Sequence, residues 1–173
     1  MPSSRPELRT LRVPSPAAAW ERLGFTVVDG VVPLGGVRIV LAEEWGWELG
    51  TPDAPPVEHP NGATGVDHVV LLTDDFDATV ERLRAEGLDH RRTRDAGDGR
   101  RQAFFVLGPC LLEVAGPVEG GERLWGVTLV APDLTPFGGD PKDAVQPGRR
   151  ITTIPREAGL RIPVAVMTPR RAA

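Results

Sequence analysis

Apolar and polar positions alternate along the chain in short blocks, and the clearest block lies near its middle. Residues 67–73 contain the continuous apolar run "VVLL", and this segment is typical of a strand buried on both faces. The following residues predict a helix with an aspartate N-cap, one apolar stripe and a terminal glycine: Asp74, Asp75, Phe76, Val80, Leu83 and Gly87. Three more strands follow at about 88–94, 101–107 and 110–115, the first two joined by a Gly/Asp-rich hairpin turn. The order of this block is βαβββ.

The block is repeated on both sides. "ATVERL" at 78–83 matches "AAWERL" at 18–23 with an offset of 60, and "VVLLTDDF" at 69–76 matches "VTLVAPDL" at 127–134 with an offset of 58. The first unit predicts a helix at 16–23 and strands near 8–13, 25–29, 36–41 and 46–49. The third unit predicts strands near 124–130, 143–146, 149–154 and 162–167. Its helix is limited to one turn, because "DLTPFGGDPK" holds two prolines and two glycines.

The repeats predict the organisation of the chain. We expect a compressed module at 1–51, a Pro/Gly-rich linker at 52–65, two paired modules at 66–117 and 122–169 that together span 66–169, and a tail at 170–173. The second and third modules are favoured as the pair, because only a short "VEGGER" segment joins them. Pairing of the first module with the second is the alternative.

Charge and composition exclude several classes of protein. A net charge of -4 argues against binding to nucleic acid, which needs clustered cations. Cys110 is the single cysteine, so neither an intrachain disulfide nor a multi-cysteine metal site can form, and its apolar surroundings predict a buried, inert thiol. No apolar run reaches the length of a membrane span, and the first residues lack the apolar core of a secretion signal. We expect a cytoplasmic protein without a membrane partner.

Repeated βαβββ units with an "HVVL" first strand and a "LLEV" fourth strand resemble the vicinal oxygen chelate superfamily of glyoxalase I, extradiol dioxygenases and bleomycin-resistance proteins. The resemblance covers about residues 8–168. It implies an α+β fold in which paired modules curl into an open, U-shaped mixed β-sheet barrel around a cleft, with helices outside. It also implies a small-molecule ligand.

In metalloenzymes of that superfamily, each module offers a histidine at the start of its first strand and a glutamate on its fourth. His68 and Glu113 match these positions in the middle module. The repeat alignment places Leu8 and Gly126 at the histidine position of the other modules, and Glu48 and Ala165 at the glutamate position. A divalent metal (zinc, nickel, manganese or iron) would therefore have His68 and Glu113 as ligands, with Glu48 as a third if the first two modules pair.

Each candidate has a simpler interpretation. His68 can be an imidazole hydrogen-bonded to backbone or to a neighbouring carboxylate, with no metal. Glu113 can face solvent or meet an arginine such as Arg101. The arginines of "HRRTRDAGDGRR" can form an anion site, but on two hairpin strands they alternate faces and we expect most to be solvated.

Strand parity predicts a mostly apolar cleft. If His68 points inward, the lining includes Val70, Leu72, Leu111, Thr128, Ala165 and Met167. Trp125 flanks this surface and closes its rim or belongs to the core, with the core favoured. Two functions remain open: a metal-assisted isomerase, lyase or dioxygenase, and a metal-free protein that binds and sequesters a small molecule. An odd number of modules further predicts that the first one pairs across a homodimer interface or caps the sheet of its own chain.

Overall fold

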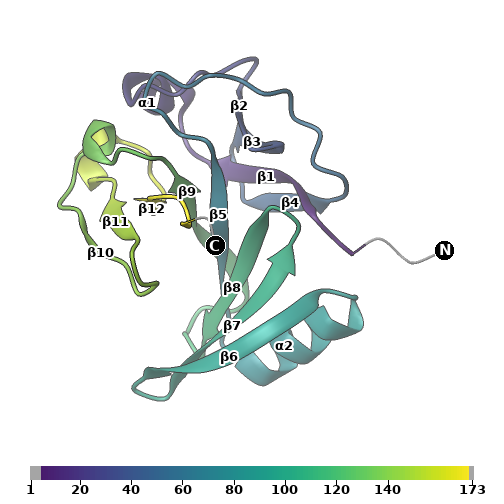
Figure 1. Cartoon of the computed structure of the whole chain (residues 1–173). Helices are drawn as coiled ribbons and strands as arrows, with labels where there is room; N and C mark the ends of the chain where they lie inside the picture. Colours follow the sequence, from purple (N-terminus) through teal and green to yellow (C-terminus); the bar gives the residue numbers. More distant parts are fainter. Residues whose placement is uncertain (1–4, 172–173) are drawn as a thin grey trace.

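The computed structural model describes residues 5–171, which form two mixed sheets and short helices (Figure 1). The larger sheet has eight strands in the order β10-β11-β12-β9-β5-β8-β7-β6, and the smaller has four in the order β2-β3-β1-β4. The expected α+β class is confirmed. Within residues 5–171 neither sheet closes into a barrel.

The second module follows the predicted order. It consists of β5 (Gly65–Leu72), α2 (Phe76–Ala85), β6 (Asp89–Gly97), β7 (Arg100–Leu107) and β8 (Cys110–Gly116). Asp75 caps α2 by accepting a hydrogen bond from the backbone N–H of Ala78 at 3.1 Å. The β6–β7 hairpin turns at Asp98 and Gly99, both with positive φ (52° and 73°), which is the geometry that a two-residue Asp-Gly turn supplies.

The third module is shorter but has the same strand order. It contains β9 (Arg123–Val130), β10 (Lys142–Asp143), β11 (Arg150–Thr153) and β12 (Val164–Met167). Where the second module has its helix, this one has a single 3-10 turn, η1 (Thr135–Phe137), as the proline and glycine content predicts. A second such turn, η2 (Arg156–Ala158), precedes β12.

The second and third modules share one sheet through their first strands. β5 and β9 run antiparallel, with His68 opposite Thr128 and Val70 opposite Gly126. β8 lies parallel to β5 on one side, and β12 lies parallel to β9 on the other. The arrangement is symmetric and agrees with the repeat offset of 58. The offset aligns residue 68 with 126 and residue 70 with 128, and the structure pairs 68 with 128 and 70 with 126.

The first module departs from the expected arrangement. It consists of β1 (Leu8–Pro14), α1 (Ala17–Arg22), β2 (Val31–Leu34), β3 (Val37–Ala42) and β4 (Gly46–Leu49). No strand forms at 25–29 beyond an isolated bridge at Val28. The β2–β3 hairpin turns at Gly35 and Gly36, which both have positive φ (59° and 88°). The predicted third strand, β3, is consequently the one that lies parallel to β1, while β4 pairs antiparallel on its other side.

This register corrects the alignment of Glu48 with Glu113. Glu113 lies opposite Val70 on the parallel strand, and the equivalent position of the first module, opposite Thr10, is Arg38. Glu48 also lies opposite Thr10, but on the antiparallel neighbour β4 of the separate four-stranded sheet. In the third module the equivalent residue is Ala165, opposite Thr128, as the alignment predicts.

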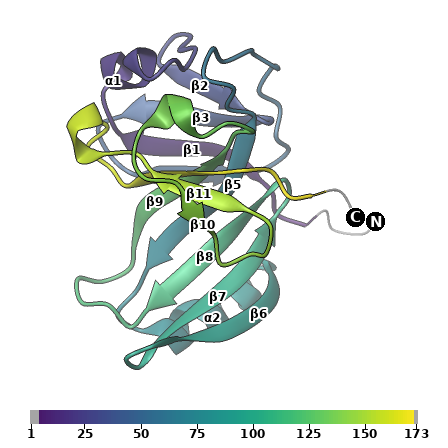
Figure 2. The ribbon, with the colours of Figure 1, turned by 60° about the vertical axis from the view of Figure 1, so that its left-hand side comes forward.

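The first module packs against the third module of its own chain. Phe25 contacts Phe137 with ring centroids 5.9 Å apart, and the Ser15 hydroxyl donates a hydrogen bond to the Leu160 carbonyl. Figure 2 shows the first module above the eight-stranded sheet, beside the loops of the third. Buried side chains from all three modules form one hydrophobic cluster, so the modules share a core.

The segment expected to be a linker is held by hydrogen bonds, although it contains neither helix nor strand before β5 begins at Gly65. The imidazole of His59 is 7% exposed, accepts a hydrogen bond from the Thr26 N–H at 3.0 Å and lies 2.6 Å from the Pro33 carbonyl oxygen. Asn61 donates to the Leu23 carbonyl at 3.0 Å. These bonds fasten residues 52–65 to the first module.

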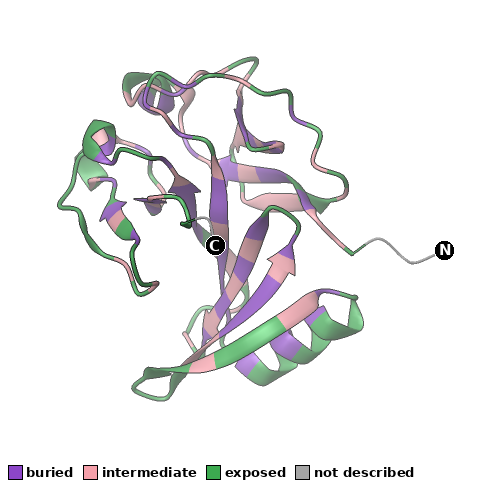
Figure 3. Ribbon diagram, viewed as in Figure 1, coloured by how far each residue is buried: buried purple, intermediate pink, exposed green. Residues whose placement is uncertain are grey.

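The eight-stranded sheet has two unlike faces. On β8, Cys110, Leu112 and Val114 are buried on the side that carries α2, whereas Leu111 and Glu113 are only partly buried on the other. Figure 3 shows this alternation of buried and intermediate residues along β8. The face away from α2 is therefore the one available for a ligand. Within residues 5–171, no helix has the length and apolar character needed to cross a bilayer.

Candidate functional site

A cavity of about 570 Å³ opens on the face of the large sheet away from α2. Its lining comes from β5 to β8 on one side and from the β10–β11 region, β12 and the chain after it on the other. The volume lies in the range of small-molecule sites. His68 and Glu113, the two candidates from the sequence, both line it.

The imidazole of His68 is held on both ring nitrogens. Nδ1 lies 2.8 Å from Oδ2 of Asp67, and Nε2 lies 3.1 Å from Oγ1 of Thr128. Nε2 is also 3.3 Å from Oε2 of Glu113. His68 thus has a carboxylate neighbour, Asp67, as an imidazole without a metal would. Its Nε2 also points toward Glu113, the other candidate metal ligand.

Glu113 belongs to a chain of polar side chains that crosses the second module. Its Oε1 accepts a hydrogen bond from Nε2 of Gln102 at 2.7 Å, and Oε1 of Gln102 accepts one from Nε of Arg94 at 2.5 Å. Arg101 does not meet Glu113, as it pairs instead with Asp77 at 2.9 Å. The reason is parity: Arg101 and Gln102 point to opposite faces of β7, and Gln102 is on the cavity side.

Asp67 connects His68 to a buried arginine. Its Oδ1 accepts a hydrogen bond from an Nη2–H of Arg149 at 2.7 Å, and the two side chains are 6% and 3% exposed. Burial alone raises the pKa of Asp67, but the hydrogen bonds from His68 and Arg149 outweigh it and hold that pKa below its ordinary value. Asp67 is therefore ionised at neutral pH.

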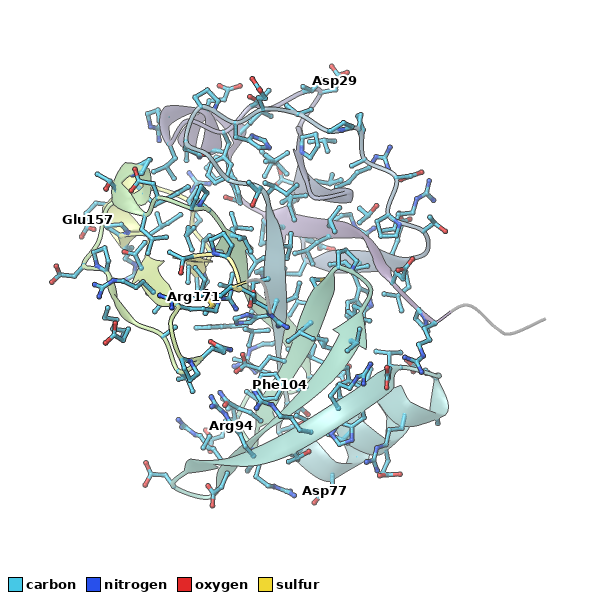
Figure 4. All side chains as sticks on the ribbon, in the orientation of Figure 1. Asp29, Asp77, Arg94, Phe104, Glu157 and Arg171 are labelled. Atoms are coloured by element: carbon cyan, nitrogen blue, oxygen red, sulfur yellow. The ribbon has the colours of Figure 1, made fainter. Side chains whose placement is uncertain are left out.

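The cavity is lined by more positive than negative side chains. Six basic residues contribute to it, against three acidic ones, although the chain as a whole has a net charge of -4; the basic residues are Arg92, Arg94, Lys142, Arg149, Arg170 and Arg171. The guanidinium carbons of Arg92 and Arg94 lie 4.9 and 5.6 Å from the ring centroid of Phe104. In Figure 4, Arg94 and Phe104 lie side by side, and Arg171 approaches from the third module.

The expected apolar cleft is therefore only partly present. Leu111 and Met167 line the cavity, and Thr128 contacts His68, but Val70, Leu72 and Ala165 lie outside the described lining. Trp125 also lies outside it and is 45% exposed, so it does not belong to the core. The basic lining comes from β6, from β10, from the segment that contains Arg149 and from the residues after β12. No periodicity in the sequence encodes how these last three parts approach the sheet.

The side chains at the centre of the cavity do not match the metal centre that the resemblance implies. A catalytic metal takes about three protein ligands. His68 and Glu113 supply two, Glu48 lies in the other sheet, and among residues 5–171 no group of three His, Cys, Asp or Glu side chains is arranged to hold a metal ion. Thr128 fills the position beside His68 from the third module.

Comparison with known proteins identifies a family. The model of the Glyoxalase/Bleomycin resistance protein/Dioxygenase superfamily matches residues 12–115, from β1 to β8. No curated protein matches the chain in sequence.

Solved structures share the fold at low identity. A methylmalonyl-CoA epimerase from Mycobacterium tuberculosis is 15% identical with a TM-score of 0.54, over 66% of this chain and 94% of that one. A variant of the Streptomyces coelicolor methylmalonyl-CoA epimerase, in complex with 2-nitronate-propionyl-CoA, is 20% identical with a TM-score of 0.51, over 64% and 97%. A hypothetical protein from Bacillus halodurans C-125 is 11% identical with a TM-score of 0.50, over 62% and 96%.

Proposed function

The chain belongs to the glyoxalase/bleomycin resistance protein/dioxygenase superfamily, and from this premise we propose that it binds a small organic anion in the cavity between its second and third βαβββ modules. The observation that carries the proposal is the excess of basic side chains in a cavity of about 570 Å³ within an acidic chain. Such a lining concentrates anions and supplies charge-assisted hydrogen bonds to them.

The second module contributes a distinct part of this binding surface. Arg92 and Arg94 both lie near the ring of Phe104, and Phe104 is 7% exposed. An anionic group placed beside them would relieve the repulsion between the two guanidinium groups, while the phenyl ring would contact the apolar part of the ligand. An organic anion with an apolar or unsaturated body fits this arrangement better than an inorganic ion does.

The proposal is tested by titrating the protein with matched pairs of anionic and neutral compounds, such as benzoate and benzamide, by isothermal titration calorimetry. Methylmalonyl-CoA belongs in the panel, because solved structures with this fold include methylmalonyl-CoA epimerases. We expect anions to bind, neutral partners to bind at least about tenfold more weakly, and Arg92→Ala and Arg94→Ala each to weaken anion binding about tenfold, the loss of one charged hydrogen bond.

Arg91→Ala is the matched control. Arg91 is next to Arg92 on the same strand but pairs with Asp89 at 3.0 Å and does not line the cavity. The Arg91→Ala variant should bind the anions as tightly as the unmodified protein does. Equal binding of anionic and neutral compounds, or an equal loss in Arg91→Ala and Arg92→Ala, would overturn the proposal.

A metal-assisted enzyme is the second candidate, favoured by one observation: Nε2 of His68 and Oε2 of Glu113 approach to 3.3 Å inside the cavity. Both are donor types that first-row divalent metals take, with nitrogen and oxygen ligands at about 2.0–2.2 Å. The test is metal content by mass spectrometry after purification without chelators. Stoichiometric metal that is lost in His68→Ala and in Glu113→Gln would support this candidate. Metal content unaffected by His68→Ala would remove His68 as a ligand.

A further inference from the structure

The third-module end of the cavity holds a buried cation whose hydrogen bonds are incomplete. Arg149 is 4% exposed; its Nε donates to the Thr168 carbonyl at 2.8 Å, and its Nη2 donates to Asp67 at 2.7 Å. Its Nη1 is buried and has no hydrogen-bond partner among residues 5–171. Buried polar groups are nearly always paired, so an unpaired charged donor calls for an acceptor that the chain itself does not supply.

Arg149 lies in the wall of the cavity, but its Nη1 atom is buried in this structure, so an oxyanion reaches this donor only when neighbouring side chains move aside. Arg149 lines both the 570 Å³ cavity and an adjoining one of about 340 Å³, and Arg170 lines both as well. Lys142 and Arg171 complete the basic end of the larger cavity. All three of these accessory cations are exposed, so each can turn toward a bound group.

The carboxylates nearby are already engaged. Asp67 accepts from both Arg149 and His68, and Asp143 pairs with Arg150, which does not line the cavity, at 3.2 Å. Lys142, Arg170 and Arg171 make no ion pair within residues 5–171. The local charge is therefore positive, and a ligand must bring the compensating negative charge.

We propose that Arg149, through Nη1, forms with Lys142 and Arg170 a subsite for an oxyanion of the cavity ligand, either a carboxylate or a phosphate. This inference rests on the proposed function and deepens it, because it adds a second position for an anionic group, at the third-module end, to the one beside Arg92 and Arg94. A ligand with two anionic groups would span the cavity between the two positions, past His68 and Glu113. The accepting oxygen lies at a charge-assisted hydrogen-bond distance from Nη1, about 2.7–2.9 Å.

The test measures the binding of inorganic phosphate, acetate and benzoate to the full chain by calorimetry, at low and at raised ionic strength. The variants are Arg149→Lys and the double variant Lys142→Ala/Arg170→Ala, with Arg91→Ala as the control. Arg149→Lys keeps a charge near Asp67 but lacks the second terminal nitrogen of the guanidinium. The double variant changes only exposed side chains, so it stays folded even if the substitution of Arg149 does not.

We expect at least one of the three anions to bind, and both variants to weaken that binding about tenfold or more while Arg91→Ala does not. Preference for phosphate over the carboxylates, or the reverse, identifies the group. A crystal structure with the preferred anion should place an oxygen within about 3.2 Å of Nη1 of Arg149.

Failure of this subsite is distinguishable from failure of the proposed function. If Arg92→Ala and Arg94→Ala weaken anion binding but Lys142→Ala/Arg170→Ala and a folded Arg149→Lys do not, the subsite is wrong and anion binding by the cavity stands. If the unmodified protein binds none of the anions in either panel, both are wrong.

Discussion

His68 and Thr128 face each other across the antiparallel strands β5 and β9, with Nε2 of the imidazole 3.1 Å from Oγ1 of the threonine. The threonine is the residue that the third module places beside His68, while Gly126, which the repeat aligns with His68, faces Val70. The third module therefore offers the imidazole a hydroxyl from Thr128, and the position that the repeat aligns with His68 carries no side chain. The polar centre of the cavity is consequently built by one module and completed by hydrogen bonds from the other.

The buried ion pair between Asp67 and Arg149 should contribute more to the free energy of unfolding than the exposed ion pairs do. Asp67→Ala leaves a buried guanidinium without a counter-charge, so the free energy of unfolding should fall by about 3–5 kcal/mol in urea denaturation followed by tryptophan fluorescence. Asp143 pairs with Arg150, and its side chain is 90% exposed. Asp143→Ala should therefore change the free energy of unfolding by about 0.5 kcal/mol or less. Similar effects of the two substitutions would contradict the burial of the first pair.

The same carboxylate should make stability depend on pH in acid. Because the pKa of Asp67 in the folded protein lies below its ordinary value of 3.8, its ionisation stabilises the fold above that value, and this contribution is lost as the pH falls through the folded pKa. The difference in unfolding free energy between the unmodified protein and Asp67→Asn should therefore be constant from about pH 7 to 5 and shrink below about pH 4. A difference that persists unchanged to pH 2.5 would rule out this linkage.

The sequence predicted those parts of the fold that depend on local periodicity. The apolar run of β5, the capped helix α2 and the proline-limited turn at Thr135–Phe137 all appear where expected, because burial on one or two faces and capping are encoded within a few residues. The first module was less predictable. Its glycines 35 and 36 form the β2–β3 turn with positive φ, but which of the later strands lies parallel to β1 depends on pairing between distant residues.

The candidate site was predictable only as far as the repeat extends. The resemblance to the vicinal oxygen chelate superfamily implied His68 and Glu113 on the first and fourth strands of one module, and they do lie together. Arg149 comes from an irregular segment of the third module, and its approach to Asp67 depends on tertiary packing between residues 82 positions apart. Lys142 lies on the two-residue strand β10, which is too short to show a periodicity. The parity of β6 could have indicated that Arg92 and Arg94 share a face, but not that this face is the one toward the cavity.

Cys110 should be chemically inert in the folded protein. Burial, with a smaller contribution from the charge of Asp67, raises the pKa of its thiol to about 12, so the reactive thiolate is scarce at pH 8. A thiol reagent should react slowly without denaturant and rapidly in urea above the unfolding transition, with Cys110→Ser as the blank. Rapid, complete reaction under native conditions would show that the thiol, which is 3% exposed in this structure, opens readily to solvent.

The contact between the first and third modules should make the chain unfold as one unit. Phe137 is 1% exposed and packs on Phe25, which in turn contacts Trp20 with ring centroids 4.9 Å apart. Phe137→Ala removes the ring on the third-module side, so the free energy of unfolding should fall by about 3–5 kcal/mol. Val145→Ala is the control, since Val145 belongs to the same module but is 74% exposed, and its effect should stay within about 0.5 kcal/mol.

Two outcomes separate a shared core from independent modules. If the core is shared, tryptophan fluorescence and far-UV circular dichroism give coincident transitions in urea for a Trp125→Phe background, because its three remaining tryptophans, Trp20, Trp45 and Trp47, lie in the first module and most strands lie in the others. Two separated transitions, with Phe137→Ala shifting only one of them, would mean that the first module folds by itself. The predicted homodimer can be checked on the same samples by light scattering: a concentration-dependent midpoint together with a doubled mass would establish it.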